Sequence, residues 1–189
     1  MRLNSAAAAA ALAIALPFAA AAQTPADLAA VHDTSTVDQT GARLLRDTVR
    51  IHAPPPVIWR ALTDQAAYRA WAGPTSFIDF RVGGAVEVVF APGGKPGDPD
   101  NLKQEITAYV PDRLLVFRNL RNPGVPGGAV YGRLAIVMEL TPVEGGMTEV
   151  SLSQVGYGDG RDFDALYGFF KAHNPDYLAS LKAFAERGN

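Results

Sequence analysis

The chain is 189 residues long, has a formal net charge of −2 at pH 7 and contains no cysteine. A mildly acidic chain without a cluster of lysine and arginine is a poor candidate for binding nucleic acid. The absence of cysteine excludes a disulfide framework, a cysteine nucleophile and a lipid attached to an N-terminal cysteine.

The first 22 residues have the layout of a secretory signal peptide. Arg2 precedes an apolar run over residues 6–16, and small residues follow, so cleavage is expected near Ala22–Gln23. A membrane anchor is the alternative, but the run is too short and too rich in alanine for a comfortable span. Cleavage removes one arginine and no acidic residue, which changes the net charge from −2 to −3. We expect an exported protein, periplasmic or secreted, without stable membrane insertion after cleavage.

Residues 23–40 are polar, small and rich in turn formers, and they predict a linker or flexible arm. A single domain is then expected over residues 41–189, a length that supports one ordinary core. Its first strand is predicted over residues 42–53, with the alternating core candidates Leu45, Val49 and Ile51.

Residues 54–71 predict two short helices. Proline suits a first helical turn, and Ile58 and Leu62 lie one turn apart. Asp64 is a candidate N-cap for the second helix, which is expected to end near Trp71.

A pair of glycines, Gly83 and Gly84, divides two alternating runs. The core-facing residues are Ile78, Phe80 and Val82 before the pair, and Val86, Val88 and Phe90 after it. This period-two pattern predicts two half-buried strands, and the glycines predict a tight hairpin turn with positive φ angles. Neither of the common glycine-rich phosphate-binding patterns occurs here, so we interpret the pair as structural.

Four further strands are predicted over residues 102–110, 114–120, 130–140 and 148–157. Short turns or loops rich in glycine and proline separate them. The predicted order is therefore one strand, two helices and six strands before the C-terminal segment.

The C-terminal segment predicts helix. Phe163, Leu166, Tyr167 and Phe170 have the spacing of an apolar stripe. Asn174–Pro175 is expected to end this helix and to begin the last one, with Asn174 as the cap. The sequence leaves open whether residues 161–176 act as a lid.

These elements predict the α+β class. Six consecutive strands joined by short connections form an antiparallel meander, and the C-terminal helix buries its apolar stripe against one face of the sheet. A curved sheet of about seven strands that grips one helix leaves room for an apolar hollow between them.

Four stretches carry a family resemblance: "VRIHAPPPVIWRALTDQAAYRAWAG", "FIDFRVGGAVEVVF", "LKQEITAYVPDRLLVF" and "MTEVSLSQVGYG". In this order they resemble the helix-grip fold of the START-like, polyketide-cyclase superfamily (SRPBCC), over roughly residues 42–187. The branch that they resemble is named for an activator of the 90-kilodalton heat-shock chaperone's ATPase. The resemblance implies a helix-grip fold and a ligand-sized cavity. It implies much less about activity, because members include lipid carriers, cyclases and co-chaperones.

The sequence departs from that family pattern in two places. One is the export signal, which argues against the activation of a cytosolic chaperone. The other is the aromatic-rich segment "RDFDALYGFFKAHNPDY" near the C-terminus.

Patterns typical of catalysis or metal binding are missing from the sequence. The histidines have no metal-ligand spacing, so neither a metal nor another cofactor is expected; they are His32, His52 and His173. A GxSxG nucleophile motif is absent. Glu87, Glu105 and Glu139 lie on predicted strands, where alternation places them toward solvent. A carboxyl that faced inward would have a raised pKa.

Aromatic residues are the strongest functional signal. Most fill the core of an ordinary domain, but "FDALYGFFKAH" has more apolar width than one stripe requires. The candidate ligand-binding residues are Trp71, Phe90, Phe117, Tyr131, Tyr167 and Phe170.

The partner expected for these residues is a small hydrophobic molecule or lipid, bound by a monomer or weak dimer. Nothing in the sequence requires catalysis. A cyclase- or hydrolase-like enzyme acting on a hydrophobic substrate is one alternative, and a co-chaperone-like protein-interaction module is another.

Overall fold

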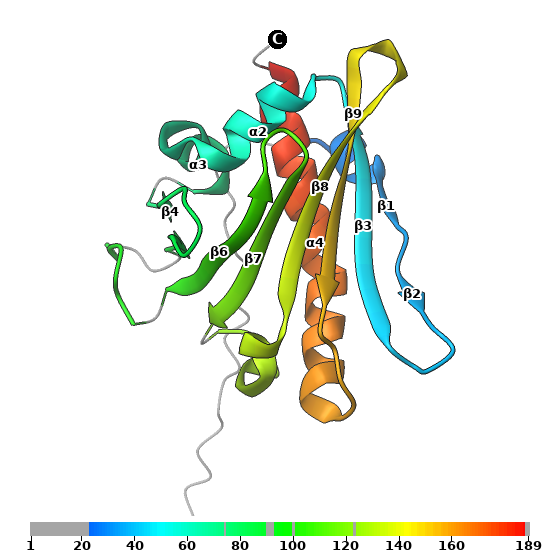
Figure 1. The fold of residues 1–189 in the computed structure, drawn as a ribbon, viewed down its shortest axis with the longest axis vertical. Helices are drawn as coiled ribbons and strands as arrows, with labels where there is room; N and C mark the ends of the chain where they lie inside the picture. Colours follow the sequence, from blue (N-terminus) through cyan, green and yellow to red (C-terminus); the bar gives the residue numbers. More distant parts are fainter. Residues whose placement is uncertain (1–22, 74, 90–92, 100, 123, 188–189) are drawn as a thin grey trace, which may run out of the picture.

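The computed structural model describes residues 23–73, 75–89, 93–99, 101–122 and 124–187. Within them, one antiparallel sheet curves around a long C-terminal helix, α4 (Arg161–Arg187), as Figure 1 shows. The strands are β1 (Val31–Asp33), β2 (Thr36–Val37), β3 (Arg43–Ile51), β4 (Phe77–Ile78), β5 (Ala85–Val88), β6 (Leu102–Val110), β7 (Leu114–Arg121), β8 (Ala135–Val143) and β9 (Met147–Val155). Their order across the sheet is β1-β3-β9-β8-β7-β6-β5-β4, and β2 also pairs with β3.

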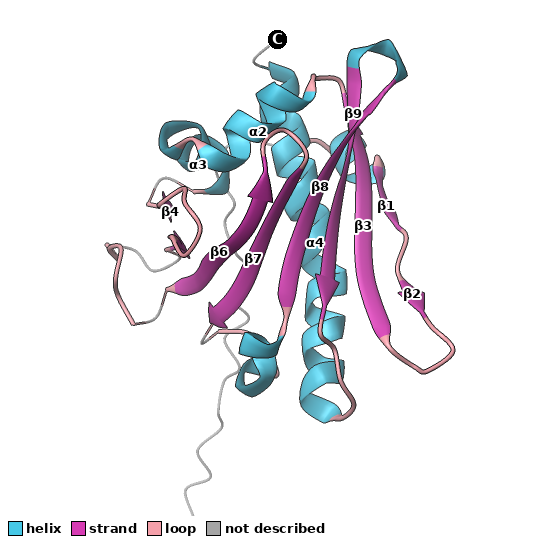
Figure 2. Cartoon of the chain, in the orientation of Figure 1, coloured by secondary structure: helices cyan, strands magenta, loops and turns pink. Residues whose placement is uncertain are grey.

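Short helices complete the fold and lie at both ends of α4 (Figure 2). They are α1 (Pro25–Ala29), α2 (Pro55–Thr63) and α3 (Gln65–Ala72), with 3-10 turns η1 (Gly128–Arg133) and η2 (Glu144–Gly146). Asp64 caps α3 as predicted, because its carboxylate accepts hydrogen bonds from the backbone of Ala66 and Ala67. The α+β helix-grip fold predicted from the sequence is confirmed.

The segment over residues 23–40 differs from the predicted linker or flexible arm. Thr24 and Asp27 form a capping box that begins α1. β1 then pairs with β3, from Val31 opposite Val49 to Asp33 opposite Asp47, and β2 pairs with the start of β3. The sequence pattern does not predict these strands because they are only three and two residues long and mostly exposed.

The first residue of that segment contacts the far end of the chain. The side-chain amide of Gln23 donates to Asp176 Oδ1 over 3.1 Å, and its carbonyl oxygen accepts from Ser180 Oγ over 2.8 Å. Both partners lie on α4.

The predicted helix break at Asn174–Pro175 is wrong. α4 runs through Pro175 as one helix of 27 residues. Asn174 does not act as a cap but is buried, and Leu178 and Leu181 one and two turns later are also buried. Packing of this helix face against the sheet outweighs the unfavourable effect of an interior proline.

The glycine pair makes the predicted turn by two different means. Gly83 has the expected positive φ of 77°, but Gly84 does not have a positive φ. A Cβ on Gly84 would lie 1.9 Å from the backbone oxygen of Asp79, so this position needs glycine for close approach. Val82 does not share the buried face of Ile78, because it lies in the turn and is 59% exposed.

The first part of the strand predicted over residues 130–140 is η1 instead. Gly127, just before η1, has a φ of 74°, and a Cβ there would lie 2.1 Å from the backbone oxygen of Asp162. This close approach between the loop and the first turn of α4 bends the chain away from an extended conformation.

Candidate functional site

The interior between the sheet and α4 contains two apolar clusters. The main cluster joins α2, α3 and the C-terminal half of α4 to the sheet, and includes Ile58, Leu62 and Leu178. The second cluster lies around η1 and the N-terminal half of α4, and includes Leu134, Phe163 and Leu166. Five of the six predicted ligand-binding residues are divided between these clusters.

Trp71 and Phe117 belong to the main cluster. Trp71 is fully buried, its indole N–H donates to the backbone oxygen of Ala61 over 2.8 Å, and its ring meets Tyr68 and Tyr177 edge-on. These contacts are those of a core residue with a satisfied polar atom.

Tyr131, Tyr167 and Phe170 are brought together in the second cluster, where Tyr167 packs at the side. The rings of Tyr131 and Phe170 stack with centroids 6.2 Å apart, and Tyr167 meets Tyr157 at 5.1 Å. Phe90, the sixth predicted residue, lies outside the described residues. The assignment of a ligand to any of the six stays a prediction.

Beside the stacked pair, a group of polar side chains lies in the interior. Gln104, on β6, donates to Asn119 Oδ1, on β7, over 2.9 Å, and both are buried. Burial raises the pKa of Tyr131, and a long hydrogen bond with the Gln104 side chain lowers it. Among the described residues, neither Asn119 Nδ2 nor the Tyr131 hydroxyl has a partner at ordinary hydrogen-bond distance. Two buried donors beside an aromatic stack therefore remain unsatisfied.

A second polar pair, Asp47 and Asn174, lies between β3 and α4. Asp47 is 2% exposed and Asn174 is 5% exposed. Burial and the charge of Asp33 raise the pKa of Asp47 to about 6, against the lowering effects of a hydrogen bond with the Asn174 side chain and of the charge of Lys171. That hydrogen bond is a long one, because in the described part of the chain neither Asp47 Oδ2 nor Asn174 Nδ2 has a partner at ordinary hydrogen-bond distance.

Sequence reasoning missed Asp47, although a signal was present. Asp47 lies on the same face of the strand as Leu45, Val49 and Ile51, which the alternating pattern predicts to face the core. An acidic residue in that register has an inward-facing carboxyl, the arrangement that raises a carboxyl pKa.

One of those glutamates also differs from its predicted solvent-facing position. Glu87 is 9% exposed, and its Oε2 accepts hydrogen bonds from the backbone of Gly97 and the side chain of Asn101. It therefore ties the loop before β6 to β5. Glu105 is half-buried and forms an ion pair with Arg118. Glu139 is exposed and forms an ion pair with Arg46.

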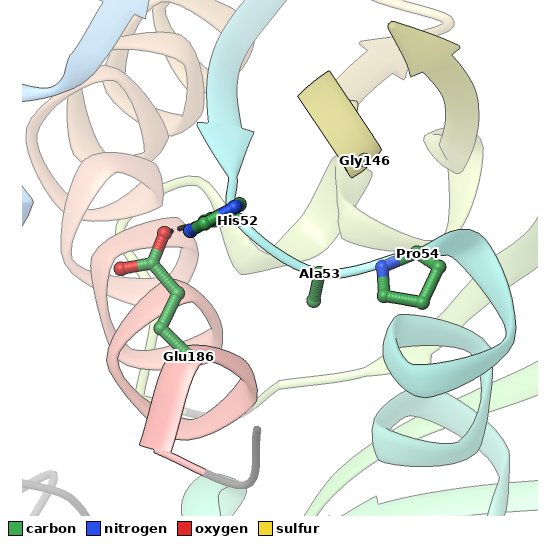
Figure 3. Close-up of a pocket in the computed structure, with 5 residues that line it drawn as sticks. All are labelled: His52, Ala53, Pro54, Gly146 and Glu186. Carbon is green, nitrogen blue, oxygen red and sulfur yellow. Dashed lines mark hydrogen bonds between the residues drawn. The ribbon is translucent and has the colours of Figure 1, made fainter. Parts of the chain in front are cut away.

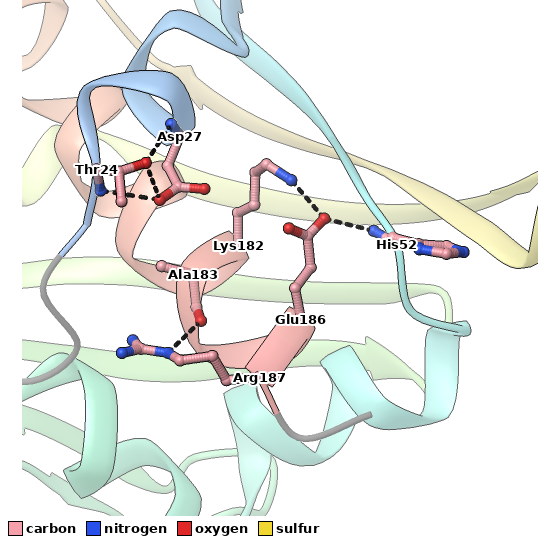
Figure 4. A network of polar contacts seen from close by, with 7 residues as sticks. All are labelled: Thr24, Asp27, His52, Lys182, Ala183, Glu186 and Arg187. Carbon is pink, nitrogen blue, oxygen red and sulfur yellow. Dashed lines mark hydrogen bonds and ion pairs between the residues drawn. The ribbon is translucent and has the colours of Figure 1, made fainter.

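A surface pocket of about 470 Å³ lies at the C-terminal end of α4, lined by His52, Ala53, Pro54, Gly146 and Glu186 (Figure 3). Glu186 accepts a hydrogen bond from the backbone N–H of His52 and pairs with Lys182 (Figure 4). The contact with His52 fastens the end of β3 to α4, and the pair with Lys182 lies within α4. None of the five predicted ligand-binding residues that the structure describes lines this pocket.

An aromatic group also reaches the surface near α2. Trp59, Phe80 and Tyr109 contact one another, with the rings of Phe80 and Tyr109 4.7 Å apart. Tyr109 is 37% exposed, and the next residue, Val110, is 47% exposed.

The described residues contain no group of three or more His, Asp or Glu side chains placed to hold a metal ion. No helix in this part of the chain combines the length and apolar character needed to cross a membrane.

Comparison with known proteins agrees with this architecture. The model of the family "Activator of Hsp90 ATPase homolog 1-like protein" matches residues 52–186. No curated protein matches the chain.

Several solved structures share the fold. The chain is similar to the Aha1 dimer from Colwellia psychrerythraea, with a TM-score of 0.61, 20% identity and coverage of 77% of this chain and 98% of the other. Protein MLL2253 from Mesorhizobium loti has a TM-score of 0.59 and 23% identity, and the match covers 76% of this chain and 98% of the other. An Hsp90 activator from Plasmodium falciparum has a TM-score of 0.50 and 17% identity, and the match covers 69% of this chain and 86% of the other.

Proposed function

The chain belongs to the Activator of Hsp90 ATPase homolog 1-like family, and from this premise we propose that it is an exported protein that binds a small, largely apolar molecule between the sheet and α4. Catalysis is no part of this proposal. Ligand sites of this kind combine aromatic and aliphatic walls with a few polar groups that fix orientation.

The observation that carries the proposal is the pair of unsatisfied donors beside the aromatic stack. Asn119 Nδ2 and the Tyr131 hydroxyl are buried without a partner among the described residues. A buried donor without a partner is unfavourable by about 1–3 kcal/mol. A ligand that carries a carbonyl or ether oxygen supplies the missing acceptor, while its apolar body packs on Phe170.

Export is supported by the sequence of the first 22 residues, which has the basic start, apolar run and small residues of a signal peptide. The test is the mass of the protein recovered from the cell envelope. A chain that begins at Gln23 supports export, and an intact Met1 start in the cytosol contradicts it.

The first test of binding is native mass spectrometry of residues 23–189 purified from the envelope, followed by denaturing extraction. The expected result is a protein–ligand complex that releases a small apolar molecule on denaturation. Titration of the extracted apo protein with that molecule then gives the affinity. A protein that carries no ligand and also binds none from a total lipid extract of the same cells contradicts the proposal.

Two variants locate the ligand. Tyr131→Phe removes one donor, and Asn119→Leu removes another together with the oxygen that accepts from Gln104. Each variant is expected to weaken binding of an oxygen-bearing ligand several-fold, because a hydrogen bond contributes roughly 0.5–1.5 kcal/mol. Glu105→Gln, which changes an ion pair on the opposite face of β6, is the matched control and leaves the affinity unchanged. Equal affinities in all three variants would place the ligand elsewhere.

A protein-interaction module is the second candidate, and the exposed aromatic group near α2 favours it. Trp59, Phe80 and Tyr109 present a joined apolar surface that is partly open to solvent. Tyr109→Ser distinguishes the two functions. It abolishes capture of a protein partner if this surface is the site, and it leaves small-molecule affinity intact if the interior is the site.

A further inference from the structure

We propose that Asp47 and Asn174 form a second polar contact for the bound molecule, one that recognises a hydroxyl group. This inference rests on the proposed binding function and adds the chemical class of the ligand, a largely apolar alcohol.

Asp47 and Asn174 lie in the interior between β3 and α4 rather than at the surface. On β3, Leu45 belongs to the second apolar cluster and Val49 to the main one, and Asp47 lies between them on the same face. Asn174 follows Phe170 by one helical turn on α4 and precedes Leu178 by one turn, and both neighbours are buried. The two polar side chains therefore meet where the two apolar clusters adjoin.

The pair has one hydrogen-bond acceptor and one donor that are not satisfied. Asp47 Oδ2 offers an acceptor and Asn174 Nδ2 offers a donor; the two side chains face each other closely enough for Asn174 to lower the pKa of Asp47, but within the described residues neither atom has a partner at ordinary hydrogen-bond distance. The Tyr157 hydroxyl, in the second cluster, is satisfied, since it donates to Gln154 over 2.7 Å. The open acceptor and donor of Asp47 and Asn174 instead resemble the unsatisfied donors of Asn119 and Tyr131.

The charged neighbours do not supply the missing partner. Lys171, on α4, pairs with Asp33, on β1, over 2.8 Å at the surface. The Asp33 carboxylate faces Asp47 and raises its pKa, whereas Lys171 and Asn174 lower it. Asp47 is therefore a buried carboxyl without a counter-ion of its own, and a ligand with a donor group relieves that arrangement.

A hydroxyl group fits the pair better than other common head groups. It donates to Asp47 Oδ2 and accepts from Asn174 Nδ2, so one group satisfies both atoms. A carboxylate is repelled by Asp47, an ammonium leaves the Asn174 donor unmet, and a hydrocarbon satisfies neither.

The test compares four probes that share one aromatic body: 2-naphthylmethanol, 2-methylnaphthalene, 2-naphthylmethylamine and 2-naphthoate. Calorimetric titration of residues 23–189 at pH 7 gives the four dissociation constants. The alcohol is expected to bind about tenfold more tightly than 2-methylnaphthalene, the effect of one to two good hydrogen bonds. It is also expected to bind more tightly than the amine and the acid.

Variants assign the preference to the pair. Asp47→Leu and Asn174→Leu keep side-chain size in apolar surroundings, and each is expected to bring the alcohol down to the affinity of 2-methylnaphthalene. Asp159→Asn, which changes an exposed acid in the loop before α4, keeps the tenfold preference. If a leucine variant does not fold, Asp47→Asn takes its place: it keeps an acceptor for the hydroxyl but loses the charge, so it is expected to keep the preference for the alcohol over 2-methylnaphthalene and to bind 2-naphthoate more tightly than the wild type does.

The outcomes separate this inference from the function on which it rests. Binding of all four probes with equal affinity keeps the apolar site and overturns the hydroxyl contact. A preference for the alcohol that survives both leucine variants also overturns it. Failure of every probe to bind, together with an empty protein from the envelope, overturns both proposals.

Discussion

Asp47 makes the stability of this fold depend on pH in the direction opposite to that of a salt-bridged carboxylate. Its pKa is raised to about 6 by burial and by Asp33, whereas an aspartate in an unfolded chain titrates near 3.9. The folded protein therefore holds a proton that the unfolded chain releases from about pH 4 upward. The stability that this proton contributes is fully present below about pH 4 and is lost as pH rises through about 6.

Replacing Asp47 by Asn removes this dependence. Between about pH 4 and pH 7, the free energy of unfolding of the wild type is expected to fall relative to Asp47→Asn by up to roughly 3 kcal/mol. Urea denaturation at several pH values measures the difference. Asp159→Asn serves as a control at an exposed position and should follow the wild type, whereas parallel pH curves for Asp47→Asn and wild type would refute the prediction.

At the scale of elements, the two turn glycines before β5 make a matched experiment. Gly83 has a φ of 77° with open space around its Cβ position, so Ala there is expected to lower stability by about 1 kcal/mol. Gly84→Ala brings a methyl group to 1.9 Å from the Asp79 backbone oxygen, which forces the backbone to move. The second loss should therefore be about 3 kcal/mol or more. Thermal or urea unfolding of both variants gives the ranking, and equal losses would contradict the reason given.

Pro175 is the weak point of α4. An interior proline removes one helical hydrogen bond and crowds the preceding turn, so Pro175→Ala is expected to raise the free energy of unfolding by about 1–2 kcal/mol. Pro55→Ala, in the first turn of α2 where proline is tolerated, should change it by less than about 0.5 kcal/mol. Urea unfolding compares the two, and a destabilised Pro175→Ala would show that the proline shapes the helix to fit the sheet.

For the whole molecule, the N-terminal segment protects one edge of the sheet. β1 and β2 cover the outer side of β3, whose backbone groups would otherwise be unpaired. A chain that begins at Gly41 is expected to be less stable than residues 23–189 by roughly 2 kcal/mol or more, since it loses several backbone hydrogen bonds worth about 1 kcal/mol each. It should also self-associate. Urea midpoints and sedimentation velocity test both effects, and an equally stable monomer would restore the description of this segment as a linker.

The sequence predicts features that depend on neighbouring residues better than features that depend on contacts between distant parts of the chain. β6, β7 and β9 were predicted within one residue at most ends, because alternation is a local property of each strand. The burial of Glu87 depends on Asn101, and that of Asp47 on Asn174, so local alternation alone does not reveal either environment. The same holds for the site: aromatic content pointed to Tyr131 and Phe170, but only the fold brings their rings together and places Trp71 in the core.

The docking of Gln23 on α4 bears on the chemistry of the mature N-terminus. The proposed cleavage after Ala22 would make Gln23 the first residue, and an N-terminal glutamine can close on itself when its amine attacks the side-chain carboxamide and expels ammonia. In this fold both ends of that carboxamide are held, by Asp176 and by Ser180. Cyclisation to pyroglutamate therefore requires the release of the first residue from the last helix. A mature chain that keeps its terminal amine would therefore indicate that Gln23 stays bound to α4 and is rarely released.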